Sequence, residues 1–166
     1  NSHVFFQNND DKKMFITKKI VEPNISSNIP GSGVDIQKFS CDRTKNKGDK
    51  FLFVGRLISD KGVFEYLKAA VEVLKIYPNK EFFLVGELGS NNKTALSKKQ
   101  LEKYTNKYPQ IKYLGKTDDI ITLLNFVDIM VLPSYREGSS KILMETAAMG
   151  KPAITTDVPG CNNIIK

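Results

Sequence analysis

The sequence predicts an α/β protein whose parallel sheet is covered by helices on both faces. Short runs that are apolar throughout indicate strands buried on both sides. Segments between these runs have the periodicity of amphipathic helices. This alternation predicts a Rossmann-like, doubly wound sheet. A length of 166 residues, with 40% hydrophobic and 26% charged residues, is ordinary for one globular domain.

Five apolar runs are the expected strands, and four helices are expected between them. The strands are FLFVG (51–55), EFFLVG (81–86), IKYLG (111–115), DIMVLP (128–133) and PAITT (152–156). The helices are expected over 63–74, over the Lys-rich stretch 94–106, from Asp118 and Asp119, and over 140–149 with Gly150 as the C-terminal cap.

A shorter pattern precedes these elements. Residues 3–6 predict a strand and residues 9–19 a helix, which Pro23 and the polar run 24–28 are expected to end. Gly31 and Gly33 indicate a turn with unusual backbone angles. Residues 37–50 are polar and charged, so we expect a linker that enters a new domain.

The net charge of +7 favours polyanionic partners such as nucleic acid, anionic lipid or phosphorylated small molecules. A solvated lysine surface is the simpler interpretation. No helix-turn-helix, RNP or zinc spacing indicates nucleic-acid binding. No apolar run approaches the roughly 20 residues that span a bilayer. His3, Cys41 and Cys161 lack the clustering of a metal site, so no metal is expected.

Ligands of doubly wound sheets bind beyond the carboxyl ends of the strands. After the first strand of the sheet, GRLISDKG (55–62) places Arg56 and Lys61 around a turn that opens a helix. This arrangement suits a diphosphate, although a charged, solvated turn has the same pattern. After the second strand, Gly86 and Gly89 permit close approach to the backbone, but no G-x-G-x-x-G or Walker motif is present.

The stretch 134–145 after the fourth strand carries two carboxylates, Glu137 in the turn and Glu145 in the following helix. Both can point into one cleft, with Ser139 and Ser140 capping the helix between them. Carboxylates accept hydrogen bonds from sugar or ribose hydroxyl groups. The alternative is a surface pair between Lys141 and Glu145, with Glu137 serving only the turn.

The stretch PSYREGSSKILMETAAMGKPAITTDVPGC resembles the signature of the family 4 retaining glycosyltransferases, the large group 1 family. GRLISDKG resembles its phosphate loop, and IPGSGVDIQKF resembles the segment that joins its two Rossmann domains. The resemblance covers about Gly31 to the chain end and implies one half of a GT-B architecture. It implies that residues 1–30 are the end of an N-terminal domain and the crossover. Residues 31–50 would be a linker, and 51–166 a nucleotide-sugar-binding domain without the family's closing C-terminal helices.

The resemblance also implies roles for residues. Arg56 and Lys61 would hold the donor diphosphate and stabilise it as it leaves, while Glu137 would contact the donor sugar near its reacting carbon. These three are the expected catalytic residues. The expected donor-binding residues are Gly55, Gly86, Tyr113, Leu114, Lys116, Gly138, Ser139, Ser140, Lys141 and Glu145. Glu145 would bind the ribose, and the base would lie near 113–116. Members of this family generally need no metal, so no cofactor is expected.

The sequence of residues 135–161 most resembles relatives that extend undecaprenyl-diphosphate-linked sugars in O-antigen or surface glycan synthesis. It implies a UDP-GalNAc or UDP-GlcNAc donor and a polyprenyl-diphosphate-linked saccharide acceptor. It also implies a partner N-terminal domain and a cytoplasmic location, peripheral to the inner membrane. We expect this chain alone to bind donor but transfer little sugar. The alternatives are a GDP-mannose or UDP-hexose transferase, a UDP-sugar epimerase, a non-catalytic nucleotide-binding module, and a basic protein that binds membranes or nucleic acid.

Overall fold

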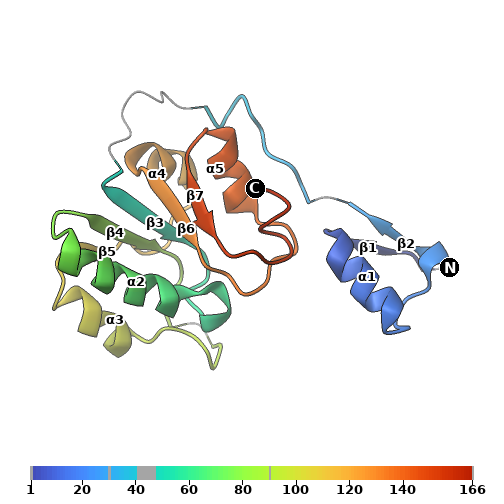
Figure 1. Ribbon diagram of the computed structural model, residues 1–166, viewed down its shortest axis with the longest axis horizontal. Coiled ribbons are helices and arrows are strands. Elements are labelled where there is room, and N and C mark those ends of the chain that lie inside the picture. Colours follow the sequence, from blue (N-terminus) through green and yellow to red (C-terminus); the bar gives the residue numbers. More distant parts are fainter. Residues whose placement is uncertain (1, 30, 41–47, 90, 166) are drawn as a thin grey trace.

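The computed structural model describes residues 2–29, 31–40, 48–89 and 91–165. It contains a small N-terminal unit and a larger sheet unit (Figure 1). The elements are β1 (Val4–Phe6), α1 (Asn9–Thr17), the 3₁₀ helix η1 (Pro23–Ile25), β2 (Ser26–Asn28), β3 (Lys50–Val54), the 3₁₀ helix η3 (Ser59–Lys61), α2 (Val63–Ile76), β4 (Glu81–Val85), α3 (Lys98–Thr105), β5 (Ile111–Tyr113), α4 (Ile120–Phe126), β6 (Ile129–Leu132), α5 (Lys141–Ala148) and β7 (Ala153–Thr155).

The larger unit is built on a five-stranded sheet of order β5-β4-β3-β6-β7, in which every pairing is parallel. The chain runs outward from β3 through β4 to β5, then returns to β6 and continues to β7. Right-handed crossovers therefore place α2 and α3 on one face and α4 and α5 on the other (Figure 1). The strand order reverses between β3 and β6, which is the switch point of the sheet.

The core of the sheet unit lies between the strands and their helices. In β4, Phe82 to Val85 are buried in succession, as expected for a strand covered on both faces. Helix α2 buries Val63, Tyr66, Leu67, Ala70 and Leu74 on one side. The Tyr66 hydroxyl lies within 3.0 Å of the carbonyl oxygens of Phe51 and Phe83, and burial raises the pKa of Tyr66.

The N-terminal unit is a β1-α1-β2 motif with two parallel strands. Helix α1 begins at the N-cap Asn8, and none of its residues is buried. Helix α1 ends at Thr17, before the polar run 24–28, and within this run Ser26–Asn28 form the strand β2, which the sequence did not predict. Their polar side chains have little strand preference, and pairing with β1 supplies the backbone hydrogen bonds instead.

The start of α3 and the role of the linker differ from those expected. Helix α3 begins at Lys98 rather than near residue 94, because Ser97 and Gln100 form a capping box there. The linker contributes Phe39 to the core cluster, although its composition is polar. Residues 41–47 of the expected linker lie outside the described residues. Gly31 and Gly33 both have φ of 70°, as expected for the turn.

Candidate active site

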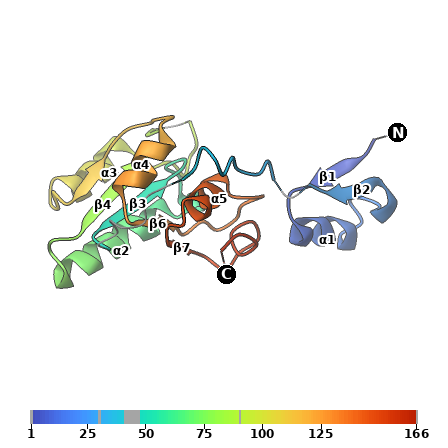
Figure 2. The same ribbon diagram turned by 90° about the horizontal axis from the view of Figure 1, so that it is seen from above.

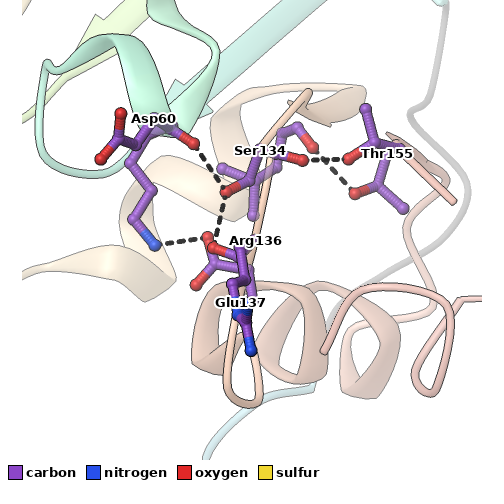
Figure 3. Close-up of polar contacts among 8 residues, drawn as sticks. Asp60, Ser134, Arg136, Glu137 and Thr155 are labelled. Atoms are coloured by element: carbon purple, nitrogen blue, oxygen red, sulfur yellow. Dashed lines mark hydrogen bonds and ion pairs between the residues drawn. The ribbon is translucent and has the colours of Figure 1, made fainter. Parts of the chain in front are cut away.

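The candidate site lies at the switch point, where the chain leaves β3 and β6. The loops 55–62 and 133–140 follow these neighbouring strands and are joined to each other. The Tyr135 amide donates to the Asp60 carbonyl at 2.9 Å. The Ser134 hydroxyl lies 3.2 Å from that carbonyl and from the carbonyl of Arg136 (Figure 3). A crevice at this position is where doubly wound folds bind their ligands.

Glycines permit the close approach of these loops. Gly62 has φ of 75°, and a Cβ there would overlap the carbonyl oxygen of Pro133. Gly160 has φ of 80° and faces the Glu137 carbonyl in the same way. Gly86 packs against the Gly55 carbonyl, so its missing side chain makes room for a neighbouring strand end. Side chains at these positions would separate the loops that build the site.

An ion pair joins the two loops at the cavity. The Lys61 Nζ lies 2.6 Å from the Glu137 Oε1, and the two side chains are only 18% and 13% exposed. Lys61 comes from η3, and the Glu137 amide is fixed by the Pro159 carbonyl at 3.2 Å. The structure thus brings together two of the three expected catalytic side chains. The Lys61 ammonium is thus partly buried and oriented by a charge-assisted hydrogen bond.

Glu145 lies between two cavities. One has a volume of about 300 Å³ and is lined by Gly55, Lys61, Glu137, Ser140, Lys141, Ile142 and Glu145, among others. The other, of about 440 Å³, shares Ile120, Lys141 and Glu145 with it. The residue is 4% exposed, and its Oε1 is 3.5 Å from the Lys141 Nζ. The pair of Lys141 with Glu145 is therefore present as the alternative expected, with Lys141 exposed, but its carboxylate is buried rather than on the surface.

The larger cavity is also lined by residues that the sequence did not indicate as site residues. They are Gly33, Val34, Asp35, Lys38 and Phe39 from the linker, and Asp118, Asp119, Ile120 and Ile121 at the start of α4. Asp119 caps α4, and hydrogen bonds from the Thr122 side chain and amide lower the pKa of its carboxyl. The acidic pair directly after a strand end was a usable signal, whereas nothing in the linker composition marked a cavity wall.

Other expected residues lie elsewhere. Arg56 is exposed and lines neither cavity. Tyr113 donates its hydroxyl to the Gly86 carbonyl at 2.9 Å, while Leu114 and Lys116 are exposed. Ser139 lies against Gly31 of the linker.

Ser140, an expected helix cap, and Gly138, an expected donor-binding residue, lie at the start of α5 and in the turn before it. Ser140 takes the N-cap position of α5, but its side chain makes no capping hydrogen bond. The Gly138 carbonyl accepts a hydrogen bond from Asn8.

Among the residues that the structure describes, no group of three or more His, Cys, Asp or Glu side chains could hold a metal ion. Within the same residues, no helix is long and apolar enough to cross a membrane.

A doubly wound sheet with its cavities at the switch point is the architecture of a nucleotide-binding α/β domain. Residues 48–166 match the family described as "Glycosyl transferases group 1". This match covers most of the chain, so the chain belongs to the group 1 glycosyltransferase family.

Two relatives are each 30% identical to this chain. One is the "UDP-Gal:alpha-D-GlcNAc-diphosphoundecaprenol alpha-1,3-galactosyltransferase" of Escherichia coli, matched over 95% of this chain and 43% of the relative. The other is the "N,N'-diacetylbacillosaminyl-diphospho-undecaprenol alpha-1,3-N-acetylgalactosaminyltransferase" of Campylobacter jejuni, matched over 96% and 44%. The chain therefore spans less than half the length of these relatives.

Solved structures share the fold. Anabaena HepE, crystallised with UDP and glucose, has a TM-score of 0.77 at 19% identity, over 99% of this chain and 47% of that one. A Staphylococcus aureus TarM variant, crystallised with UDP among its ligands, has a TM-score of 0.82 at 15% identity, over 99% and 32%. The prediction of a Rossmann-like sheet that is one half of a GT-B architecture is confirmed.

Proposed function

We propose that this chain is the nucleotide-sugar-binding half of a retaining glycosyltransferase. The whole enzyme would transfer an N-acetylhexosamine from a UDP-sugar to a polyprenyl-diphosphate-linked saccharide. The observation that carries the proposal is the meeting of Lys61, Glu137 and Glu145 in one cavity at the switch point. Membership of the group 1 family and the names of the two lipid-linked relatives support the reaction class.

The donor diphosphate is assigned to the cavity between the two loops. Helix α5 begins there with Ser140, Lys141 and Ile142 along the cavity wall, and its N-cap side chain leaves the first amides free of a cap. Such a helix start attracts phosphate through its amides and its dipole. Lys61 adds a cation from the opposite loop, and the exposed Arg56 on the same loop is assigned as the second.

Transfer breaks the bond between the anomeric carbon and the diphosphate oxygen, and forms a bond on the same face between that carbon and an acceptor hydroxyl oxygen, whose proton passes to the leaving diphosphate. Negative charge then develops on the leaving diphosphate, and positive charge on the sugar ring. Lys61 and the α5 amides are placed to stabilise the diphosphate, and the Glu137 carboxylate faces the position assigned to the sugar. In this proposal the protein cations provide the stabilisation of the leaving group without a metal.

The nucleoside is assigned to the larger cavity. Glu145 stands between the two cavities, so its carboxylate can accept hydrogen bonds from ribose hydroxyls while the diphosphate lies on the Lys61 side. The base would then lie between the linker and the start of α4 at 118–121. The expected base loop, 113–116, is not among the residues that line this cavity, so the base is assigned to the linker and the start of α4 instead.

The donor sugar is the least constrained part of the proposal. The E. coli relative is named for UDP-Gal and the C. jejuni relative for N-acetylgalactosamine, at equal identity to this chain. A UDP-hexose donor is therefore the second candidate. The lipid-linked acceptor, an N-terminal partner domain and a cytoplasmic site at the inner membrane are proposed from the same relatives and the family resemblance.

Calorimetric titration of this chain with UDP, GDP, ADP and UDP-GalNAc tests the donor assignment. UDP should bind selectively, and Glu145→Ala should weaken its binding about tenfold or more, because a charged acceptor is removed. Glu102→Ala, a carboxylate on the exposed side of α3, is the control and should leave binding unchanged. Selective binding of GDP or ADP would overturn the UDP assignment. Equal affinity of Glu145→Ala would overturn the ribose role.

A further inference from the structure

The turn 136–139 carries Glu137 and is covered by the N-terminal residues. The Asn8 Nδ2 donates to the Gly138 carbonyl at 2.9 Å across 130 positions of sequence. The Asp11 carboxylate pairs with the Arg136 guanidinium. A Cβ on Gly138 would overlap the Gln7 side chain, so the two segments are in close contact. Figures 1 and 2 show the N-terminal unit beside the α5 end of the sheet unit.

Asn8 uses its whole side-chain amide in this contact. Its Oδ1 accepts from the Asp11 amide at 2.7 Å and so caps α1. Its Nδ2 donates to the Asp11 Oδ2 and to the Gly138 carbonyl, both at 2.9 Å. The residue is 3% exposed. One buried amide therefore fixes the start of α1 and joins it to the turn, and removing it leaves buried polar groups without partners.

The sheet unit holds the same turn from its other side. The Glu137 amide donates to the Pro159 carbonyl at 3.2 Å, and the Ser140 amide donates to the Gly160 carbonyl at 3.1 Å. Both residues next to Glu137 in sequence, Arg136 and Gly138, are in turn bound by the N-terminal unit. The backbone that carries the Glu137 carboxylate is thus fixed between two separate parts of the chain.

We infer that Asn8 and Asp11 are positioning residues that hold the turn 136–139 and so set the place of Glu137 relative to Lys61. The role of Glu137 at the sugar rests on the proposed function, whereas the restraint on the turn does not depend on it. In the proposed function the ribose and base lie at Glu145 and in the larger cavity, away from the turn, whereas the diphosphate and the sugar lie beside it. Loss of the restraint should therefore weaken binding of a nucleotide-sugar more than binding of the nucleotide alone.

Hydrogen exchange of this chain without ligand tests the restraint. Asn8→Ser keeps an oxygen that can cap α1 but removes the donor to Gly138. It should speed exchange of the Glu137 and Ser140 amides about fivefold, the effect of one ordinary hydrogen bond. Asp10→Asn is the matched control, because it changes an exposed carboxylate on the same helical turn. Exchange at these amides that is unchanged in Asn8→Ser would overturn the inference.

A second measurement guards against a variant that simply loosens the N-terminal unit. Asp11→Asn and Arg136→Gln should each speed exchange in the turn, and the double variant should be no faster than the faster single one. Fully additive effects would contradict the pairing.

Calorimetry with UDP and UDP-GalNAc then separates this inference from the proposed function. Asn8→Ser should lower the UDP-GalNAc affinity by a few fold more than the UDP affinity. Equal losses for both ligands would overturn the positioning role of Asn8. Absence of UDP binding by the unaltered chain would overturn the proposed function, and the exchange results would still decide whether the turn is restrained.

Discussion

The sheet unit and the N-terminal unit are stabilised by different interactions. Helix α2 of the sheet unit buries five residues against the strands, whereas α1 of the N-terminal unit buries none. The N-terminal unit has only two strands, and it contacts the sheet unit through polar groups such as Asn8 and Asp11. A two-stranded unit without a buried helix face is marginal by itself. Hydrophobic burial thus builds the scaffold, and a few hydrogen bonds attach the unit beside it.

The largest expected effect comes from adding a side chain at Gly62, where the two loops of the site are in close contact. Gly62→Ala should lower the free energy of unfolding by about 3 kcal/mol, because the new Cβ meets the Pro133 carbonyl and the backbone stays in the left-handed region. Gly89→Ala is the matched control, since Gly89 has φ of 71° with no atom near its Cβ position. It should cost about 1 kcal/mol. Urea denaturation of both variants measures the difference, and equal losses would show that the loop contact can relax.

Shortening one apolar side chain in a helix of each unit tests this comparison directly. Leu67→Ala in α2 should cost about 3 kcal/mol, because it leaves a cavity in a fully buried site. Ile16→Ala in α1, where the side chain is partly exposed, should cost about 1 kcal/mol or less. Urea midpoints followed by circular dichroism would report both changes. A loss for Ile16→Ala that matches Leu67→Ala would show that the N-terminal unit shares the cooperative core.

A smaller effect separates ion pairs inside the site from those outside it. A double-mutant cycle with Lys61→Met and Glu137→Gln should give a coupling of about 1 kcal/mol, because this pair is largely shielded from water. The same cycle for Lys98 and Glu102 should give about 0.3 kcal/mol, since those side chains are 82% and 49% exposed at 3.9 Å. The free energy of unfolding of each variant supplies both values. Equal coupling energies would mean that burial does not strengthen the pair in the site.

The sequence was informative wherever burial decides the structure. The five apolar runs all form strands of the sheet, and the pattern is clearest in β4, where a strand covered on both faces is apolar throughout. The spacing of Glu137 and Glu145 indicated that both carboxylates could point into one cleft, and both line the cavity where β3 and β6 end. The ion pair of Lys61 with Glu137 and the burial of Glu145 were not predicted.

Features that depend on distant partners were not predictable. The contact of Asn8 with Gly138 joins positions 130 apart, and no local pattern marks it. Strand β2 is polar because pairing with β1, rather than its own side chains, holds it in place. The Tyr113 hydroxyl donates a hydrogen bond to the Gly86 carbonyl, and this partner depends on how the neighbouring strand ends pack. Sequence alone gives the ends of strands but not the directions of side chains beyond them.

The smallest expected effect is on the labelling rate of the Cys161 thiol, which compares the influence of the two units on the core. Cys161 is fully buried, and burial raises the pKa of its thiol. In a Cys41→Ser background, the folded protein should therefore react with a thiol reagent at pH 8 only when the sheet unit opens. Leu67→Ala should speed this labelling, whereas Asn8→Ser should leave its rate unchanged, because Asn8 restrains only the turn. Faster labelling in Asn8→Ser would mean that the polar contacts also stabilise the core.

The pH dependence of stability in the Cys41→Ser protein gives an independent test of the raised pKa of the Cys161 thiol. The folded thiol has a raised pKa, so its contribution to stability is complete below the pKa of the unfolded thiol, about 8.5. Above this pH the unfolded chain loses its proton first, and the folded state should lose stability as the pH rises further. Cys161→Ala should reduce the slope of the free energy of unfolding against pH between about 8.5 and 9.5. A slope that is the same with and without the thiol would show that Cys161 ionises equally in both states, and hence that water reaches its thiol in the folded protein.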